Sequence, residues 1–123
     1  MKRCLVVDDS EIVRKVARAL IESLKYEVTE AASGQEALDA CKAAMPDIIF
    51  LDWYMPGSNS LDIIRGIRAL GVFKRGYILY CMTEIDPDVL ARAKTAGIDD
   101  VILKPFDRES VTSRFAGFAL AAA

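Results

Sequence analysis

Short apolar runs alternate with helical repeats of apolar residues along the whole chain. A run that is apolar throughout predicts a buried strand, and apolar residues spaced three and four apart predict an amphipathic helix. The predicted strands cover residues 5–7, 27–31, 48–51, 77–82 and 101–103. The predicted helices cover residues 12–24, 34–44, 61–68 and 87–96, and a fifth begins at about Asp107. This alternation favours an α/β fold whose parallel sheet is covered by helices on both faces.

Residues with special backbone roles mark the ends of several predicted elements. Ser10 is a candidate N-cap for the first helix, and Pro87 fits the first turn of the fourth. Gly71 follows the third helix at a position where glycine ends helices. The segment 27–31 alternates polar and apolar side chains, so we expect a less buried strand at the edge of the sheet.

Length and composition fit a single domain over residues 1–123. Hydrophobic residues make up 53% of the chain and charged residues 28%, which is typical of a globular domain. The net charge of −2 lacks the basic excess that nucleic-acid binding needs, so we expect no nucleic-acid partner. Arg14, Lys15 and Arg18 form a basic stripe that we expect to be a solvated helix face. The alanine-rich end, 119–123, is expected to fray.

The chain contains no histidine, which excludes several chemistries. A Ser-His-Asp triad and a phosphorylated histidine both need that side chain, so we expect neither a conventional histidine kinase nor a phosphotransfer carrier. Cys4, Cys41 and Cys81 lie too far apart in the sequence for a zinc motif, and each lies in an apolar run. We expect buried, reduced thiols in a cytoplasmic protein. The apolar stretch before Asp8 is short, so we expect neither a signal peptide nor a membrane span.

Charged side chains stand where several predicted strands end. Asp8 and Asp9 follow the first strand, Asp52 the third and Lys104 the fifth. Ligands of open parallel sheets bind beyond the carboxyl ends of the strands. If these strands are neighbours, three carboxylates and one ammonium share a single pocket.

Three carboxylates in one pocket repel one another, and a divalent cation relieves that repulsion. Mg²⁺ fits because it takes oxygen ligands and keeps some of its waters. Lys104 adds a compact positive charge for a nearby anion. Together these groups suit phosphoryl transfer onto a carboxylate oxygen. Taken singly, an Asp pair is most often a helix cap and a Lys-Pro pair a loop, so the hypothesis rests on their coincidence at strand ends.

Three segments resemble the motifs of the CheY-like receiver domain of two-component response regulators: Val7-Asp8-Asp9-Ser10, 51–56 and Lys104-Pro105-Phe106. The resemblance covers almost the whole chain, and the three motifs in this order at these spacings are highly specific. It implies a flavodoxin-like (βα)5 fold, a doubly wound parallel sheet with strand order 2-1-3-4-5. It also implies a cis peptide bond before Pro105, which the family often has.

The resemblance implies a role for each charged residue of the expected pocket. Asp52 would accept a phosphoryl group from a phospho-histidine or a small phosphodonor. Asp9 would ligate Mg²⁺ directly and Asp8 mainly through water. Asp52 itself and the backbone carbonyl of Tyr54 would be further ligands. Lys104 would pair with a phosphoryl oxygen.

The residues that usually transmit the switch in this family differ here. Met82 stands 30 residues after Asp52 and 22 before Lys104, where the family usually has a threonine. Methionine has no hydroxyl to bind a phosphoryl oxygen. Thr83 comes one residue late, and only a bulge would bring it into that role. Val101 replaces the usual Tyr or Phe, so both members of the threonine–aromatic relay are missing.

Two loop positions after the predicted phosphoacceptor also depart from the family pattern. Tyr54 replaces a residue that is commonly smaller or polar, and its ring could shield an acyl phosphate from water. Ser60 stands where the family usually has glycine, and it would be strained if that position needs a positive φ.

We expect a signalling protein of a two-component system that is not an enzyme. Mg²⁺-dependent phosphorylation of Asp52 would switch protein–protein binding. The input partner would be a histidine kinase or a phosphotransfer protein. An unidentified output protein would bind the face formed by the fourth helix, the fifth strand and the fifth helix, and no membrane is expected to take part.

Three alternatives remain open. A non-switching receiver, indicated by Met82 and Val101, would be a constitutive interaction module whose binding does not depend on phosphorylation. A Mg²⁺-dependent phosphohydrolase would usually carry a second acid two residues after its nucleophile, where this chain has Tyr54. A flavin-binding domain would need a phosphate-cradling loop after the first strand, and Asp8-Asp9 would repel a flavin phosphate.

Overall fold

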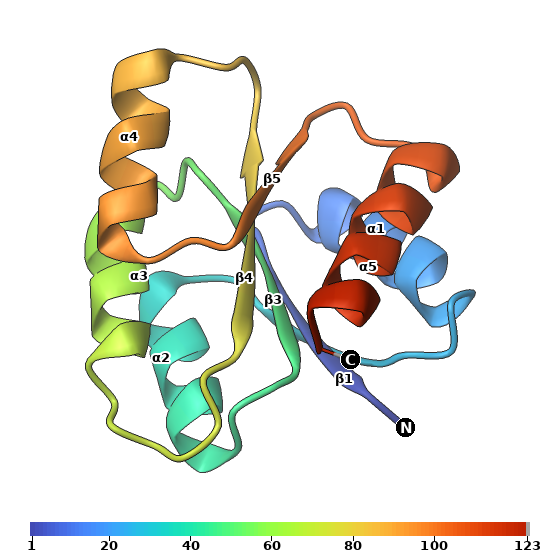
Figure 1. The fold of residues 1–123 in the computed structure, drawn as a ribbon, viewed down its shortest axis with the longest axis horizontal. Helices are drawn as coiled ribbons and strands as arrows, with labels where there is room; N and C mark the ends of the chain where they lie inside the picture. Colours follow the sequence, from blue (N-terminus) through green and yellow to red (C-terminus); the bar gives the residue numbers. More distant parts are fainter. Residues whose placement is uncertain (123) are drawn as a thin grey trace.

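A five-stranded parallel sheet forms the centre of the protein (Figure 1). The computed structural model describes residues 1–122. The strands are β1 (Arg3–Val7), β2 (Glu27–Ala31), β3 (Ile48–Asp52), β4 (Tyr77–Met82) and β5 (Asp100–Leu103). The helices are α1 (Glu11–Glu22), α2 (Gly34–Ala43), α3 (Ser60–Arg68), α4 (Pro87–Ala96) and α5 (Arg108–Ala122). Strands and helices alternate as the apolar pattern predicts.

The strands lie in the order β2-β1-β3-β4-β5, and every neighbouring pair is parallel. The predicted flavodoxin-like (βα)5 fold is therefore confirmed. β2 lies at one edge of the sheet, as its alternating pattern predicts. All five residues of β3 are buried, because this strand lies at the centre and is covered on both faces.

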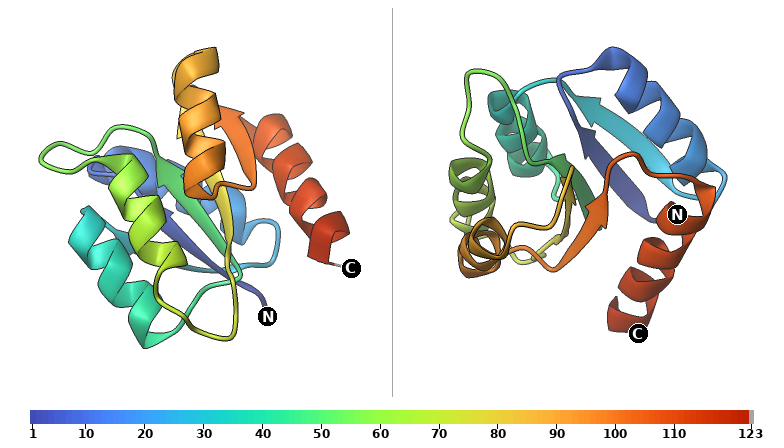
Figure 2. Two further views of the ribbon diagram at one scale, coloured as in Figure 1. Left: turned by 60° about the vertical axis from the view of Figure 1, so that its left-hand side comes forward. Right: turned by 90° about the horizontal axis from the view of Figure 1, so that it is seen from above.

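Helices cover the two faces of the sheet unequally. Seen from above, α2, α3 and α4 lie on one side and α1 and α5 on the other (Figure 2). Ile49, Leu51 and Ile64 belong to the core on the three-helix side. Phe50 and Phe115 belong to the core on the two-helix side. Successive residues of β3 thus alternate between the two cores, as the period of a strand requires.

Side-chain caps fix where the helices begin. The Ser10 hydroxyl accepts the N–H of Val13 at 3.3 Å, which confirms Ser10 as the N-cap of α1. Asp86 caps α4, and Pro87 occupies its first turn as predicted. Residues 119–122 of the alanine-rich end, where we expected fraying, form the last turn of α5 in the structure. Ala123 lies outside the described residues.

Arg68 ties α3 to the amino edge of the sheet, a role that its place in a helical pattern did not indicate. Its guanidinium donates to the backbone carbonyl of Gly97 at 2.9 and 2.8 Å. It also donates to the carbonyls of Arg75 at 2.8 Å and Gly76 at 2.7 Å, and pairs with Asp99 at 2.8 Å. One side chain therefore satisfies backbone acceptors of two separate loops.

The predicted state of the three cysteines agrees with the structure. Cys4, Cys41 and Cys81 are free and buried, and burial raises the pKa of each thiol. Within residues 1–122, no helix combines the length and the apolar character needed to cross a membrane.

Candidate functional site

The carboxyl edge of the sheet brings together three of the predicted site residues. Asp8 directly follows β1, and Asp52 is the last residue of β3, the strand beside β1. Lys104 follows β5 and reaches across the end of β4. Its Nζ lies 3.0 Å from Asp8 Oδ2 and 3.3 Å from Asp52 Oδ1. One ammonium group therefore bridges two carboxylates from neighbouring strands.

Burial decides the electrostatics of this pocket, because Asp8 is only 4% exposed and Asp52 only 5%. Burial, and then the charge of Asp8, raises the pKa of Asp52 from 3.8 to about 6. Lys104 and the backbone N–H of Tyr54 oppose that rise. Burial disfavours the charged form of Lys104, but the two carboxylates outweigh it and raise the Lys104 pKa. The pocket holds more negative charge than one lysine neutralises.

The surplus negative charge suits a divalent cation. Asp9 adds a third carboxylate at the exposed mouth of the pocket. Asp8, Asp9 and Asp52 each offer one oxygen, and these oxygens lie within 4.8 Å of one another. An all-oxygen set with an open, solvent-facing side fits Mg²⁺, which keeps several of its waters. The hydrogen bond from the Tyr54 N–H to Asp52 places the Tyr54 backbone beside the same pocket.

Arg14 holds the loop that carries the two N-terminal aspartates. It donates to the backbone carbonyl of Asp8 at 2.8 Å and to Glu30 at 3.0 Å. Arg18 donates to the same Glu30 at 2.8 Å. The expectation that this basic stripe is a solvated face is therefore wrong for Arg14 and Arg18, and it holds for the exposed Lys15. Sequence spacing gave no signal for this contact, because β2 supplies Glu30.

Met82 keeps the position where the family usually has its switch threonine. Its side chain is 3% exposed at the end of β4. The pairing of β4 with β5 runs without interruption to Met82 and Leu103, so no bulge moves Thr83 inward. Thr83 is exposed at the pocket mouth. Trp53, Met82 and Thr83 line part of a hollow of about 260 Å³ beside the acidic pocket.

The aromatic residues after Asp52 stand together at the start of the loop between β3 and α3. The ring centroids of Trp53 and Tyr54 are 5.6 Å apart. Trp53 is 36% exposed and Tyr54 58%, so both rings face solvent next to the phosphoacceptor candidate. A change of charge at Asp52 therefore occurs beside the single tryptophan of the chain.

Val101 is half-buried in β5 and packs against the core on the α4 side of the sheet. Together with Ile85, Leu90 and Arg114 it lines a hollow of about 450 Å³. This hollow lies on the predicted output face, between α4, β5 and α5. The short valine side chain leaves open the space that a larger aromatic residue would partly fill.

Ser60 and Tyr80 form a buried contact that the sequence did not reveal. The two hydroxyl oxygens are 2.6 Å apart and join the first residue of α3 to β4. Ser60 does not adopt a positive φ, so the condition for strain at this position is not met; Gly57, with φ 76°, makes the turn in this loop. Burial raises the pKa of Tyr80 and the charge of Asp52 adds to it, although the Ser60 hydrogen bond opposes the rise.

The peptide bond between Lys104 and Pro105 is cis, as the resemblance implies. The ammonium that bridges Asp8 and Asp52 thus comes from the residue directly before this bond. Phe106 follows, and its ring lies edge-on to Phe50 of β3 at 5.2 Å. The third motif is therefore anchored to the central strand that carries Asp52.

Known proteins share this sequence pattern. Residues 4–116 match the family model of the response regulator receiver domain. Chemotaxis protein CheY1 of Helicobacter pylori is 37% identical over 106 residues, which is 85% of this chain and 86% of that protein. CqsS, a CAI-1 autoinducer sensor kinase/phosphatase of Vibrio cholerae, is 32% identical over 118 residues; the match covers 95% of this chain and 17% of that protein.

Solved structures share the fold. Chemotaxis protein CheY4 of Vibrio cholerae superimposes with a TM-score of 0.90 at 30% identity, covering 96% of this chain and 98% of that one. The receiver domain of sensor histidine kinase PA1611 from Pseudomonas aeruginosa has a magnesium ion coordinated in its active-site cleft. It superimposes with a TM-score of 0.85 at 26% identity, covering 95% and 96% of the two chains. The chain belongs to the response regulator receiver domain family.

Proposed function

We propose that this receiver accepts a phosphoryl group on Asp52, with Mg²⁺ held by Asp8, Asp9 and Asp52. The observation that carries the proposal is the Lys104 ammonium, which lies within 3.3 Å of Asp52 and 3.0 Å of Asp8. Receiver domains in general accept phosphoryl groups and bind Mg²⁺ at an acidic pocket. The burial of Asp52 and its neighbours fits that role here.

Each residue of the pocket has its own role in the proposed phosphoryl transfer. One carboxylate oxygen of Asp52 attacks the phosphorus, and the new P–O bond forms as the donor's bond to phosphorus breaks and its electron pair leaves with the donor. Asp8, Asp9 and Asp52 would hold Mg²⁺, and the ion would supply positive charge to the phosphoryl oxygens. Lys104 holds one phosphoryl oxygen through its ammonium, and Asp8 keeps that ammonium in place at 3.0 Å. The attack needs no general base, because Asp52 reacts as its anion.

The partners follow from the same chemistry. Receiver domains interact with histidine kinases or phosphotransfer proteins, and we assign this chain a donor of that kind. The output surface is the face of α4, β5 and α5, where Val101 lines an open hollow. Met82 cannot hydrogen-bond a phosphoryl oxygen, so the signal reaches this face without the usual threonine.

Trp53 fluorescence tests the proposal, because this ring adjoins Asp52 and is partly exposed. We expect a saturable change on adding Mg²⁺ and a second change on adding beryllofluoride, a phosphoryl mimic. Asp52→Ala should abolish the second change. A protein that binds Mg²⁺ but gives no response to beryllofluoride, by fluorescence and by calorimetry, contradicts phosphoryl acceptance at Asp52.

A further inference from the structure

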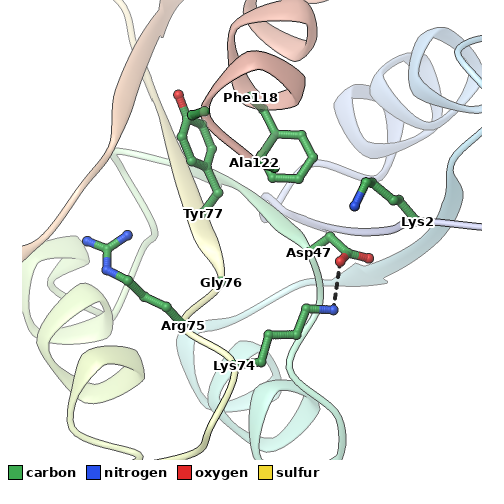
Figure 3. Close-up of a pocket in the computed structure, with 9 residues that line it drawn as sticks. Lys2, Asp47, Lys74, Arg75, Gly76, Tyr77, Phe118 and Ala122 are labelled. Atoms are coloured by element: carbon green, nitrogen blue, oxygen red, sulfur yellow. Dashed lines mark ion pairs between the residues drawn. The ribbon is translucent and has the colours of Figure 1, made fainter.

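The amino edge of the sheet, opposite the acidic pocket, carries a hollow of about 260 Å³ (Figure 3). Its lining includes Lys2 just before β1, Asp47 just before β3 and Gly76 just before β4. Asp47 and Asp52 stand at the two ends of β3, about 16 Å apart at 3.3 Å per residue. A molecule bound in this hollow therefore leaves Asp52 accessible.

The floor of the hollow is apolar and aromatic. Tyr77 of β4 and Phe118 of α5 pack at a steep angle, with ring centroids 5.1 Å apart. Ala121 and Ala122 from the last turn of α5 add to this apolar lining. Apolar surface at the base of a concave site favours insertion of an apolar side chain from a ligand.

Cations surround this floor. The Lys2 ammonium lies 5.7 Å from the centre of the Phe118 ring, and the side chains of Lys74 and Arg75 are 46% and 58% exposed. Asp47 is the one carboxylate among the described lining residues, and it already pairs with Lys74 at 2.7 Å. Arg75 pairs with Asp99, which lies outside the hollow and also pairs with Arg68, so the cations still outnumber the carboxylates here. The rim is therefore locally positive in a chain whose net charge is −2.

The loop between α3 and β4 extends this surface. Phe73 is fully exposed and Val72 is 43% exposed. Both line a smaller hollow of about 140 Å³ that shares Lys74 and Arg75 with the first. An aromatic side chain that packs into no core, beside a positive rim, is typical of an interaction anchor.

We propose that this basal surface, formed by Lys2, residues 72–77 and Phe118, binds an acidic segment of a partner protein. An apolar side chain of the segment enters the aromatic hollow, and its carboxylates meet Lys2, Lys74 and Arg75. The concave floor fits a single side chain better than the flat surface of a bilayer. Binding here is independent of phosphorylation, so the partner stays attached while Asp52 gains and loses its phosphoryl group.

A peptide titration followed by amide chemical shifts tests the assignment. The probe is an octapeptide of Asp and Glu around one Phe, and its control replaces the acids with Lys around the same Phe. We expect saturable shifts at Lys2, residues 72–77 and Phe118 with the acidic peptide, weakened by salt, and none with the basic one. No shifts at these residues, or equal shifts with both peptides, overturns the proposal.

Substitutions on and away from the basal surface test whether the peptide binds there. K74Q/R75Q and F73S should each weaken the acidic peptide roughly tenfold, as expected for losing an anchoring contact. K42Q/R92Q, which removes two exposed cations from α2 and α4, should leave the affinity unchanged. Unaltered binding by F73S and K74Q/R75Q contradicts the proposal. Binding to vesicles of anionic phospholipid without binding of the peptide replaces it with a lipid surface.

Discussion

Asp52 is a buried charge whose cost to folding can be measured. Asp52→Asn keeps the shape and an acceptor for the Tyr54 N–H but removes the negative charge. Folding raises the pKa of Asp52 from 3.8 to about 6, and this difference corresponds to about 3 kcal/mol of destabilisation above pH 6 in the absence of metal. Lys104 loses one of its two partners in the variant, so the expected gain is about 1–3 kcal/mol.

The raised pKa of Asp52 determines how the stability of the wild type changes with pH. Between pH 3.8 and about 6 the folded protein holds the Asp52 proton more tightly than the unfolded chain does. The free energy of unfolding of the wild type therefore falls as pH rises through this window, and the Asn variant escapes that loss. The advantage of the variant should be largest at pH 8 and should shrink towards pH 4.

Urea unfolding followed by Trp53 fluorescence, in EDTA at several pH values, measures this difference. Asp39→Asn, at an exposed acid of α2, is the matched control and should change stability by less than about 0.5 kcal/mol. Added Mg²⁺ should stabilise the wild type more than the Asn variant, because the variant lacks one carboxylate ligand. A variant that is no more stable than the wild type at pH 8, or a gap that does not depend on pH, refutes this account.

Three further substitutions test other contacts. Lys104→Ala should lower metal-free stability at pH 8 by about 2 kcal/mol, since two buried carboxylates lose their cation; Mg²⁺ should then stabilise the variant more than the wild type in thermal unfolding. Tyr80→Phe should lower the free energy of unfolding, measured in urea, by about 1–2 kcal/mol, because the buried Ser60 hydroxyl loses its partner. A double-mutant cycle with Ser60→Ala should show that the two hydroxyls are coupled. Arg68→Leu should lower the free energy of unfolding by about 3 kcal/mol, because three backbone carbonyls lose their side-chain donor and Asp99 loses one of its two arginine partners; an unchanged urea midpoint contradicts that role.

The sequence predicted the fold well because its signals are local. The apolar run of β3 indicates a strand buried on both faces, and the helical repeat of α1 indicates a helix buried on one face. Both elements form where these patterns predict them. Periodicity alone does not order the strands; the order came from the resemblance and agrees with the structure. The predicted ends differ from the observed ones by one or two residues. β3 and β5 each include one more residue, Asp52 and Asp100. β1 begins two residues earlier than predicted, at Arg3, and α1 ends two residues earlier, at Glu22.

The site was predictable only where chemistry coincides with strand ends. Asp8, Asp52 and Lys104 each follow or end an apolar run, and the structure brings all three together. Arg14 was misread as solvated and the contact of Ser60 was missed, because their partners, Glu30 and Tyr80, lie on strands distant in the sequence. Long-range polar contacts leave no periodic trace in a sequence, so only the three-dimensional arrangement reveals them.

Direct detection of phosphorylation tests the central claim. Intact-protein mass spectrometry after incubation with a small phosphodonor and Mg²⁺ should show the addition of one phosphoryl group. The addition should be absent with EDTA and in Asp52→Asn, and Asp39→Asn should be phosphorylated like the wild type. No added phosphoryl group on the wild type, or one that persists in Asp52→Asn, would contradict the assignment of Asp52 as the phosphoacceptor.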